Sequence, residues 1–281
     1  MTTRSQRGFT LLEAVTVIVI MGIFGVFIVT FVQVPVRAYV DAAARAEASD
    51  LADNTMRRLA RDLRLALPNS VRVDGTNSYI EYIETKGGLR YLAEDDTDAA
   101  AGPLYLSWNN AASLQFTVVG GVPAGRHAPL VGDSIVVYNL GPGQEPGNAY
   151  NCCNRATIAA VGAGTLTLAS NPFATQAASG AQLMSPGKRF HVVSSPVTYG
   201  CDSATGRLMR YWNYPYSAGQ VAPPAGAQQA ILAENVSSCT FTYASLASQR
   251  SGLIGITLRF SVQDGSAPMT LLHQIHVNNT P

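Results

Sequence analysis

The fold follows from one stretch near the N-terminus, RGFTLLEAVTVIVIMGIFGVFIVTFV, which spans residues 7–32. After Arg7 its only charged side chain is Glu13, close to the start of a long apolar run. A helix that rises about 1.5 Å per residue over this run covers the roughly 30 Å hydrocarbon core of a bilayer. Arg4 and Arg7 precede the run, so the positive-inside rule predicts a cytoplasmic N-terminus and export of the chain beyond the run.

A cleaved secretory signal peptide and a plain signal anchor both explain this segment incompletely. The apolar run is too long for a signal peptide, and no small-x-small cleavage site follows it. A plain anchor explains the length and the arginines. It does not explain Glu13, because a carboxylate at the membrane is costly and marks a function. It also leaves the Gly8-Phe9 step without a reason.

The heptapeptide RGFTLLE, residues 7–13, resembles the N-terminus of type IV pilins and type II secretion pseudopilins. The resemblance implies that Gly8 ends a short basic leader and that prepilin peptidase cuts between Gly8 and Phe9. It also implies that Phe9 becomes methylated, that the helix is retained, and that Glu13 is the acidic hallmark of the family. The implied partners are other minor and major pilins, prepilin peptidase and an inner-membrane assembly platform.

An unpaired Glu13 in lipid is costly, so a cationic partner can drive subunit assembly. The resemblance implies that this partner is the free amine of Phe9 on a neighbouring subunit. Because the pair would be buried, we expect it to set the register of the subunits more than to stabilise them.

Residues 36–67 are expected to continue as an amphipathic helix, after a kink or a membrane exit at Pro35. Its apolar face recurs at spacings of three to five residues: Leu51, Met56, Leu59, Leu63 and Leu67. Arginines lie around the other side, with interleaved acids that favour a solvated face: Arg57, Arg58, Arg61, Arg64, Asp50, Asp53 and Asp62. We expect Arg58 to pair with Asp62, and Pro68-Asn69 to end the helix.

The remainder indicates a β-rich body. Nine segments alternate, or are β-branched and aromatic, between turn residues: 78–85, 113–119, 134–140, 165–170, 189–195, 206–212, 239–244, 253–262 and 269–277. Residues 139–154 and 214–229 are predicted loops. The fold class is therefore α+β, a long N-terminal helix packed on a mainly antiparallel sheet.

The chain divides into a leader (1–8), a transmembrane and filament-core helix (9–35), an amphipathic helix (36–68) and a body (69–281). We expect a single-pass inner-membrane protein whose body lies in the periplasm and later joins a pilus or pseudopilus. The formal net charge of +1 argues against nucleic-acid binding through a strong basic field.

Four cysteines occur, and none forms a CxxC zinc knuckle. Outside the cytoplasm, disulfides are the natural interpretation, and we pair Cys201 with Cys239 because each lies in or beside a β-type run. Adjacent Cys152 and Cys153 leave two alternatives open, a vicinal bridge or free thiols. All four could instead be reduced core residues.

No motif for catalysis is present, since HExxH and GxSxG are absent. We therefore predict no enzyme and no resident cofactor. His273 and His276 are three apart on a predicted strand, so they point to opposite faces and do not share a metal. Acidic residues in EDDTD are weak candidates for Ca²⁺, and a solvated loop is the favoured alternative: Glu94, Asp95, Asp96 and Asp98.

Two stretches of the body, RFHVVSSPVTYGC and LLHQIHVNNTP, resemble the minor pilin-like protein of the mannose-sensitive haemagglutinin pilus system. The stretch MRRLARDLRLALP is similar to the J-type minor pseudopilins of type II secretion. Both resemblances imply a minor subunit that initiates, caps or supports assembly. A membrane-anchored periplasmic enzyme or binding protein is the alternative of another class, and loop 139–154 is where an adhesive site would be sought.

Overall fold

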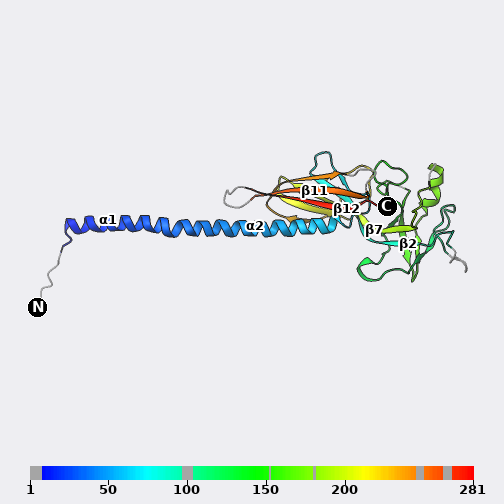
Figure 1. The fold of residues 1–281 in the computed structure, drawn as a ribbon, viewed down its shortest axis with the longest axis horizontal. Coiled ribbons are helices and arrows are strands. Elements are labelled where there is room, and N and C mark those ends of the chain that lie inside the picture. Colours follow the sequence, from blue (N-terminus) through cyan, green and yellow to red (C-terminus); the bar gives the residue numbers. More distant parts are fainter. Residues whose placement is uncertain (1–7, 97–103, 152, 180–181, 245–249, 262–267) are drawn as a thin grey trace.

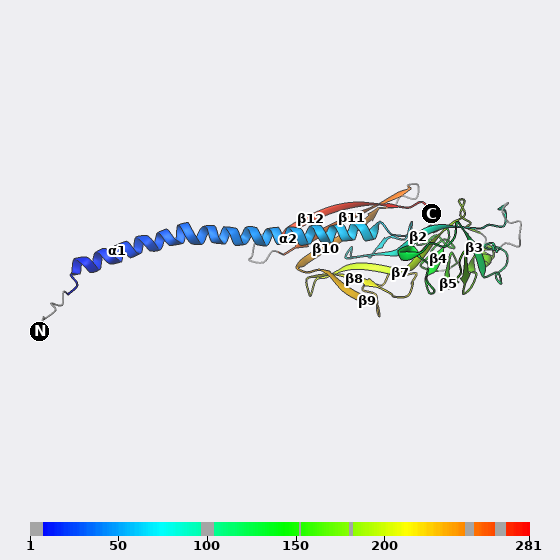
Figure 2. The same ribbon diagram turned by 90° about the horizontal axis from the view of Figure 1, so that it is seen from below.

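The computed structural model describes residues 8–96, 104–151, 153–179, 182–244, 250–261 and 268–281. One long helix leads from the N-terminus into an elongated β-rich body (Figures 1 and 2). The helix consists of α1 (Leu11–Ile28), a π-helical turn η1 (Val29–Gln33) and α2 (Val34–Leu63). All strand pairings are antiparallel in the described residues, so the α+β prediction is confirmed.

Two sheets make up the body. The strands are β1 (Arg72–Val73), β2 (Tyr79–Tyr91), β3 (Gln115–Val119), β4 (Ser134–Val136), β5 (Arg155–Val161), β6 (Thr165–Leu168), β7 (Arg189–Asp202), β8 (Arg207–Trp212), β9 (Gln228–Ala233), β10 (Val236–Ala244), β11 (Ser251–Phe260) and β12 (Met269–Asn278). Short 3-10 helices occupy Gly125–His127 and Pro172–Ser179. The larger sheet has the order β1-β2-β3-β6-β5-β4-β7-β8-β9, and the smaller has the order β10-β11-β12.

The long strands β2 and β7 pair with each other along most of their length and divide the body into two lobes. Beside α2, their paired ends join β1, β8, β9 and the smaller sheet in what we call the proximal lobe. Beyond a register shift at Thr85, the pairings β2-β3-β6-β5-β4-β7 return to β2 and close a small barrel, the distal lobe. Figure 2 shows the distal lobe at the end of the molecule farthest from the N-terminus.

The proximal core explains why α2 lies where it does. Its apolar face is buried with residues of both sheets, and the fully or almost fully buried members include Leu59, Leu63, Tyr82, Phe241 and Ile256. Of the predicted apolar face, Met56, Leu59 and Leu63 are buried in this core and Leu51 is partly exposed, whereas Leu67 is buried beyond the end of the helix. A disulfide between Cys201 and Cys239, with a Cα–Cα distance of 5.9 Å, joins β7 to β10 and so connects the sheets, as predicted. Cys152 lies outside the described residues, and no described cysteine is free.

Pro35 neither breaks the helix nor ends it. It stands in the first turn of α2, directly after the π-helical turn η1. Proline has no N–H to donate, and its ring collides with the carbonyl one turn earlier. The wider π-helical turn gives the proline ring enough space to avoid this clash, so the helix continues.

The C-terminal end of α2 differs from the prediction. The α-helix ends at Leu63, ahead of Pro68-Asn69, because β2 takes the following backbone groups: Leu67 N–H donates to the Ile83 carbonyl (2.8 Å) and Thr85 N–H donates to the Leu65 carbonyl (2.9 Å). The expected Arg58–Asp62 ion pair is absent from the described residues. Asp62 instead accepts a hydrogen bond of 2.5 Å from Tyr199 Oη.

All nine predicted strand segments contain strands, and β1, β5 and β9 were not predicted. The sequences of β5 and β9, RATIAAV and QQAILA, are rich in alanine, which is depleted in strands, so pairing with neighbouring strands outweighs the weak local signal. β9 begins inside the loop predicted for 214–229. β7 runs through Pro196, which stands next to a register shift where a missing N–H is tolerated.

The packing of α2 makes a testable prediction about stability. Leu59 is 0% exposed, so Leu59→Ala leaves a cavity and should lower the free energy of unfolding by about 2–5 kcal/mol. Leu272→Ala removes the same atoms from a side chain that is 71% exposed, and should change the free energy of unfolding by less than about 0.5 kcal/mol. Urea unfolding of the detergent-solubilised chain measures both, and equal losses would contradict the packing described.

Candidate functional site

The N-terminal segment places a processing step just outside a capped helix. Gly8 and Phe9 are exposed and precede the helix, and Phe9 is 79% exposed. Thr10 is the N-cap of α1: its backbone is extended (φ −83°, ψ 150°) and its Oγ1 accepts a hydrogen bond from Glu13 N–H at 3.3 Å. The helix therefore begins after the Gly8-Phe9 bond and does not need the residues before it.

Glu13 lies in the first turn of α1. A carboxylate there complements the unpaired N–H groups and the positive end of the helix dipole. Thr16 Oγ1 donates a hydrogen bond of 3.0 Å to the backbone carbonyl of Glu13, so this contact does not involve the Glu13 carboxylate. Within the described residues, no hydrogen bond or ion pair reaches that carboxylate. The structure thus presents Glu13 as an exposed acid at the start of an apolar helix.

The helix that begins here exposes an apolar surface that water does not favour. No residue of α1 or η1 is buried, and large side chains such as Ile18, Met21, Ile23 and Phe27 are half or more exposed. Figure 1 shows α1 far from the body. Within the described residues this is the one helix long and apolar enough to cross a bilayer. So large an apolar surface indicates contact with lipid or with other helices.

Two of the acidic residues considered as calcium ligands, Asp95 and Asp96, form ion pairs with basic side chains. Lys188 Nζ lies 2.8 Å from both Asp95 Oδ1 and Asp96 Oδ1, and Arg90 lies 2.7 Å from Asp96. The hydrogen bond from Lys188 lowers the pKa of Asp96 to about 2. Asp98 lies outside the described residues. Glu94 is in the same turn as Asp95, and its carboxylate lies 3.5 Å from Tyr105 Oη.

The histidines do not gather either. His276 is exposed on β12, whereas His273 is half-buried on the opposite face, as the strand prediction requires. His127 Nδ1 lies 2.6 Å from the Lys86 carbonyl, and burial lowers the pKa of His191. No group of three His, Cys, Asp or Glu residues in the described part of the chain could hold a metal ion.

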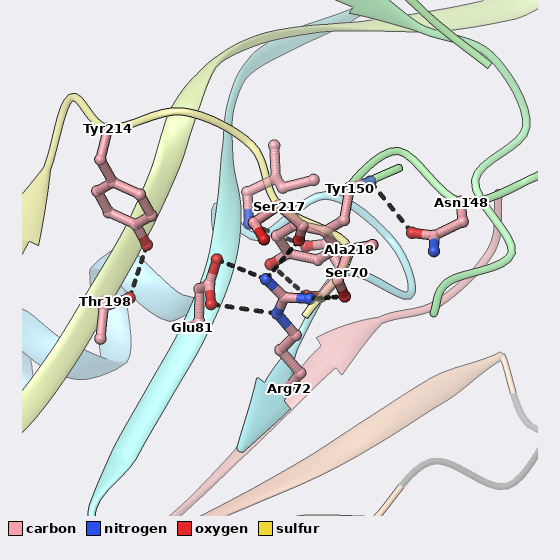
Figure 3. A network of polar contacts seen from close by, with 10 residues as sticks. Ser70, Arg72, Glu81, Asn148, Tyr150, Thr198, Tyr214, Ser217 and Ala218 are labelled. Carbon is pink, nitrogen blue, oxygen red and sulfur yellow. Dashed lines mark hydrogen bonds and ion pairs between the residues drawn. The ribbon is translucent and has the colours of Figure 1, made fainter. Parts of the chain in front are cut away.

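A largely buried polar cluster surrounds Arg72 of β1 (Figure 3). Its guanidinium makes two hydrogen bonds to the Glu81 carboxylate, of 3.1 and 3.0 Å. It also donates to the carbonyls of Ala218 (2.7 Å) and Ser217 (2.9 Å). The Tyr150 ring lies against it, with its centroid 3.7 Å from Arg72 Cζ. One cation therefore ties β1, β2, the 139–154 loop and the 213–218 loop together.

This cluster is built for structure. Tyr150 Oη donates to the Ser70 carbonyl at 2.8 Å, and Tyr214 Oη lies 2.6 Å from Thr198 Oγ1. Burial raises the pKa of Glu81, and the hydrogen bonds from Arg72 counteract part of that rise. These polar groups are hydrogen-bonded to one another, which indicates that the cluster stabilises the fold and is not a reactive site.

Removing Arg72 tests this interpretation. Arg72→Ala leaves Glu81 buried and unpaired, and should lower the free energy of unfolding by about 3–5 kcal/mol. Because the pKa of Glu81 is already raised in the folded state, the folded variant binds a proton more readily than the unfolded chain. Its stability should therefore recover as the pH falls from about 8 to about 5, measured by urea unfolding at each pH.

The matched control is Arg207→Ala. Arg207 pairs with Glu234 at 3.3 Å on the surface, where both side chains are largely exposed. That loss should stay below about 1 kcal/mol and should not depend on pH in this range. A similar loss in both variants, or no recovery at low pH for Arg72→Ala, would contradict the role assigned to the buried pair.

Two features of these sites escaped the sequence reasoning. Thr10 was missed although T-x-x-E before an apolar run is the signature of a helix N-terminus. The Arg72–Glu81 pair was missed because β1 is so short. The turn residues at 74–78 could have indicated the hairpin that sets Arg72 opposite Glu81.

Comparison with known proteins gives one finding. Residues 3–29 match the family model described as the prokaryotic N-terminal methylation motif. The match includes Gly8, Phe9 and Glu13. No curated protein and no solved structure matches the chain significantly. The motif supports a pilin-like or pseudopilin protein that prepilin peptidase processes, and it points to a structural role rather than an enzymatic one.

Proposed function

We propose that this chain is a minor pilin or pseudopilin that initiates, caps or supports assembly of a type IV pilus of the mannose-sensitive haemagglutinin type. The observation that carries the proposal is the exposed Gly8-Phe9 bond, placed directly before a capped apolar helix whose first turn holds Glu13. Cleavage at that bond removes the leader and leaves the helix and the body intact. The chain then offers an amine at Phe9 and an acid at Glu13.

The rest of the chain fits anchoring in the inner membrane with a periplasmic body. The apolar helix is long enough to span the membrane once. The Cys201–Cys239 disulfide suits an oxidising compartment, where such bonds persist. Other pilins, prepilin peptidase and an assembly platform are the proposed partners, and no resident cofactor is part of the proposal.

Mass spectrometry of the mature N-terminus tests the processing step. The chain produced with a prepilin peptidase should begin at a methylated Phe9, and Gly8→Val should retain the leader because a branched side chain blocks close approach to the scissile bond. Gly25→Ala, inside the helix, serves as the control and should be processed normally. An intact Met1 in the unaltered chain, or a cut elsewhere, would refute the assignment.

Assembly tests the role of Glu13. Glu13→Val should leave the body folded and membrane insertion intact or improved, because an unpaired acid near lipid is costly. It should reduce incorporation into filaments about tenfold or more, if loss of the charged pair costs the 1.4 kcal/mol that corresponds to such a factor. The readout is the amount of the chain in sheared filaments relative to membranes.

Asp41→Val is the matched control, because Asp41 is an exposed acid of α2 outside the apolar run. It should leave incorporation unchanged. Normal incorporation of the Glu13→Val variant into filaments would contradict the proposed pairing of Glu13 with the Phe9 amine.

A minor J-type pseudopilin of type II secretion is the second candidate. It is favoured by the stretch MRRLARDLRLALP, which covers the end of α2 and the turn that follows it. Rescue of either a pilus-assembly mutant or a secretion mutant by this chain decides between the two systems.

A further inference from the structure

The distal lobe carries a cavity of about 610 Å³ beside its apolar core. The cavity lies between the turn that follows β2, at residues 93–96, and the turn that leads into β7, at residues 185–188. A volume of this size is typical of pockets that hold a small molecule or a few side chains. Figure 2 shows the distal lobe at the end of the molecule farthest from the N-terminus, so the membrane anchor does not approach the cavity.

Hydrogen bonds hold the two turns in place on either side of the cavity. In the first turn, Asp96 N–H donates to the Ala93 carbonyl at 3.1 Å. In the second turn, Lys188 N–H donates to the Ser185 carbonyl at 2.9 Å. The turns are also joined to each other, because Tyr91 N–H donates to the Lys188 carbonyl (2.9 Å) and Lys188 Nζ lies 2.8 Å from Asp96 Oδ1. The cavity is therefore formed by the fold itself.

The inner part of the cavity is apolar. Tyr91 and Trp108 line it and are only 1% and 5% exposed, so their rings form its floor. The Phe173 ring packs against the Trp108 ring, with 5.4 Å between the ring centroids, and fixes its position. Met184 and Pro186 line the cavity nearer to the solvent, and both are exposed. Because a methionine side chain adapts to different apolar shapes, this wall suits an apolar group that enters from outside.

The mouth of the cavity is acidic. Glu94 and Asp95 line it, and both are exposed. The nearby cations Lys188 and Arg90 form ion pairs with Asp95 and Asp96, so two positive charges balance two negative ones. Among the described residues, Glu94 has no ion-pair partner. One uncompensated carboxylate therefore stands at the mouth of an apolar cavity, where it attracts a cation.

We propose that this cavity binds a protein segment in which an apolar side chain stands next to a lysine or an arginine. The apolar side chain enters the cavity and displaces water from the floor formed by Tyr91 and Trp108. The neighbouring cation lies at the mouth, beside Glu94, and gives the contact its charge preference. Both aromatic rings of the lining are almost fully buried, so neither presents an open face on which a sugar ring can stack.

Methyl NMR of the full-length chain in detergent, labelled with carbon-13 at its methionine methyl groups, tests binding at the cavity itself. Met184→Leu identifies the Met184 signal by removing it. The probe is N-acetyl-phenylalanyl-lysine amide, whose aromatic ring should shift the Met184 signal in a saturable way. The signal of Met56, which is buried under α2, should not move.

Two further peptides test the charge preference, with glutamine or glutamate in place of the lysine. The glutamine peptide should bind about two- to fivefold more weakly than the lysine peptide, because an exposed ion pair adds little. The glutamate peptide should bind more weakly still, since its carboxylate is repelled by Glu94. Added salt should reduce the differences among the three peptides, because it screens exposed charges.

Two variants at exposed positions, each with a matched control, separate the charge from the cavity. Glu94→Gln should make the lysine and glutamine peptides bind equally, whereas Glu47→Gln, the same change at an exposed acid of α2, should leave the preference intact. Asn109→Trp places a large side chain at the exposed edge of the cavity and should abolish the shift with every peptide. Asn54→Trp, on the exposed side of α2, should not affect the shift.

Three results would overturn the proposal. If none of the peptides shifts the Met184 signal at millimolar concentration, the cavity does not bind an apolar side chain. If all three peptides bind equally, the acidic mouth does not select a cation. If methyl glucoside shifts the signal and the peptides do not, the cavity binds carbohydrate instead of a protein segment.

Discussion

One continuous helix contacts two different environments, and the rest of the structure depends on this. Along α1 and η1 every residue is exposed, so lipid or other helices must cover an apolar surface. Along the second half of α2 one face is buried against both sheets, with Leu59 and Leu63 fully covered. Pro35 lies between these parts, and the π-helical turn before it keeps the helix unbroken. The body is therefore held at a defined height and angle relative to the anchor.

The distal lobe depends on the proximal lobe through β2 and β7, which contribute strands to both. At the bend between the lobes, Thr85 bonds to the turn that comes after α2, and Pro196 occupies the neighbouring register shift. A small buried cluster that includes Leu67, Ile83 and Tyr150 fills the junction. The Arg72–Glu81 pair holds the adjoining loops. The end of α2, the bend in β2 and β7 and the adjoining loops are thus held together by hydrogen bonds, buried apolar contacts and one ion pair.

Two kinds of charge have opposite costs in this chain. Glu81 is buried but fully paired, so its desolvation is offset within the molecule. The Glu13 carboxylate, by contrast, is exposed and has no hydrogen-bond or ion-pair partner among the described residues. Paired charge in the body thus helps to fix the shape of the body, whereas the exposed acid at the start of α1 is accessible to a partner from another molecule.

Local pattern alone determined the N-terminal motif, the apolar face of α2, nine of the strands and the Cys201–Cys239 bridge. The first three depend on residues close in the chain, and the bridge was expected because each cysteine lies in or beside a β-type run. Tertiary structure decided where α2 ends, because β2 competes for the backbone of Leu65 and Leu67. It also made strands of alanine-rich β5 and β9, closed the distal barrel, and turned Asp62 toward Tyr199. These outcomes rest on contacts between distant segments, whose energies local propensity does not contain.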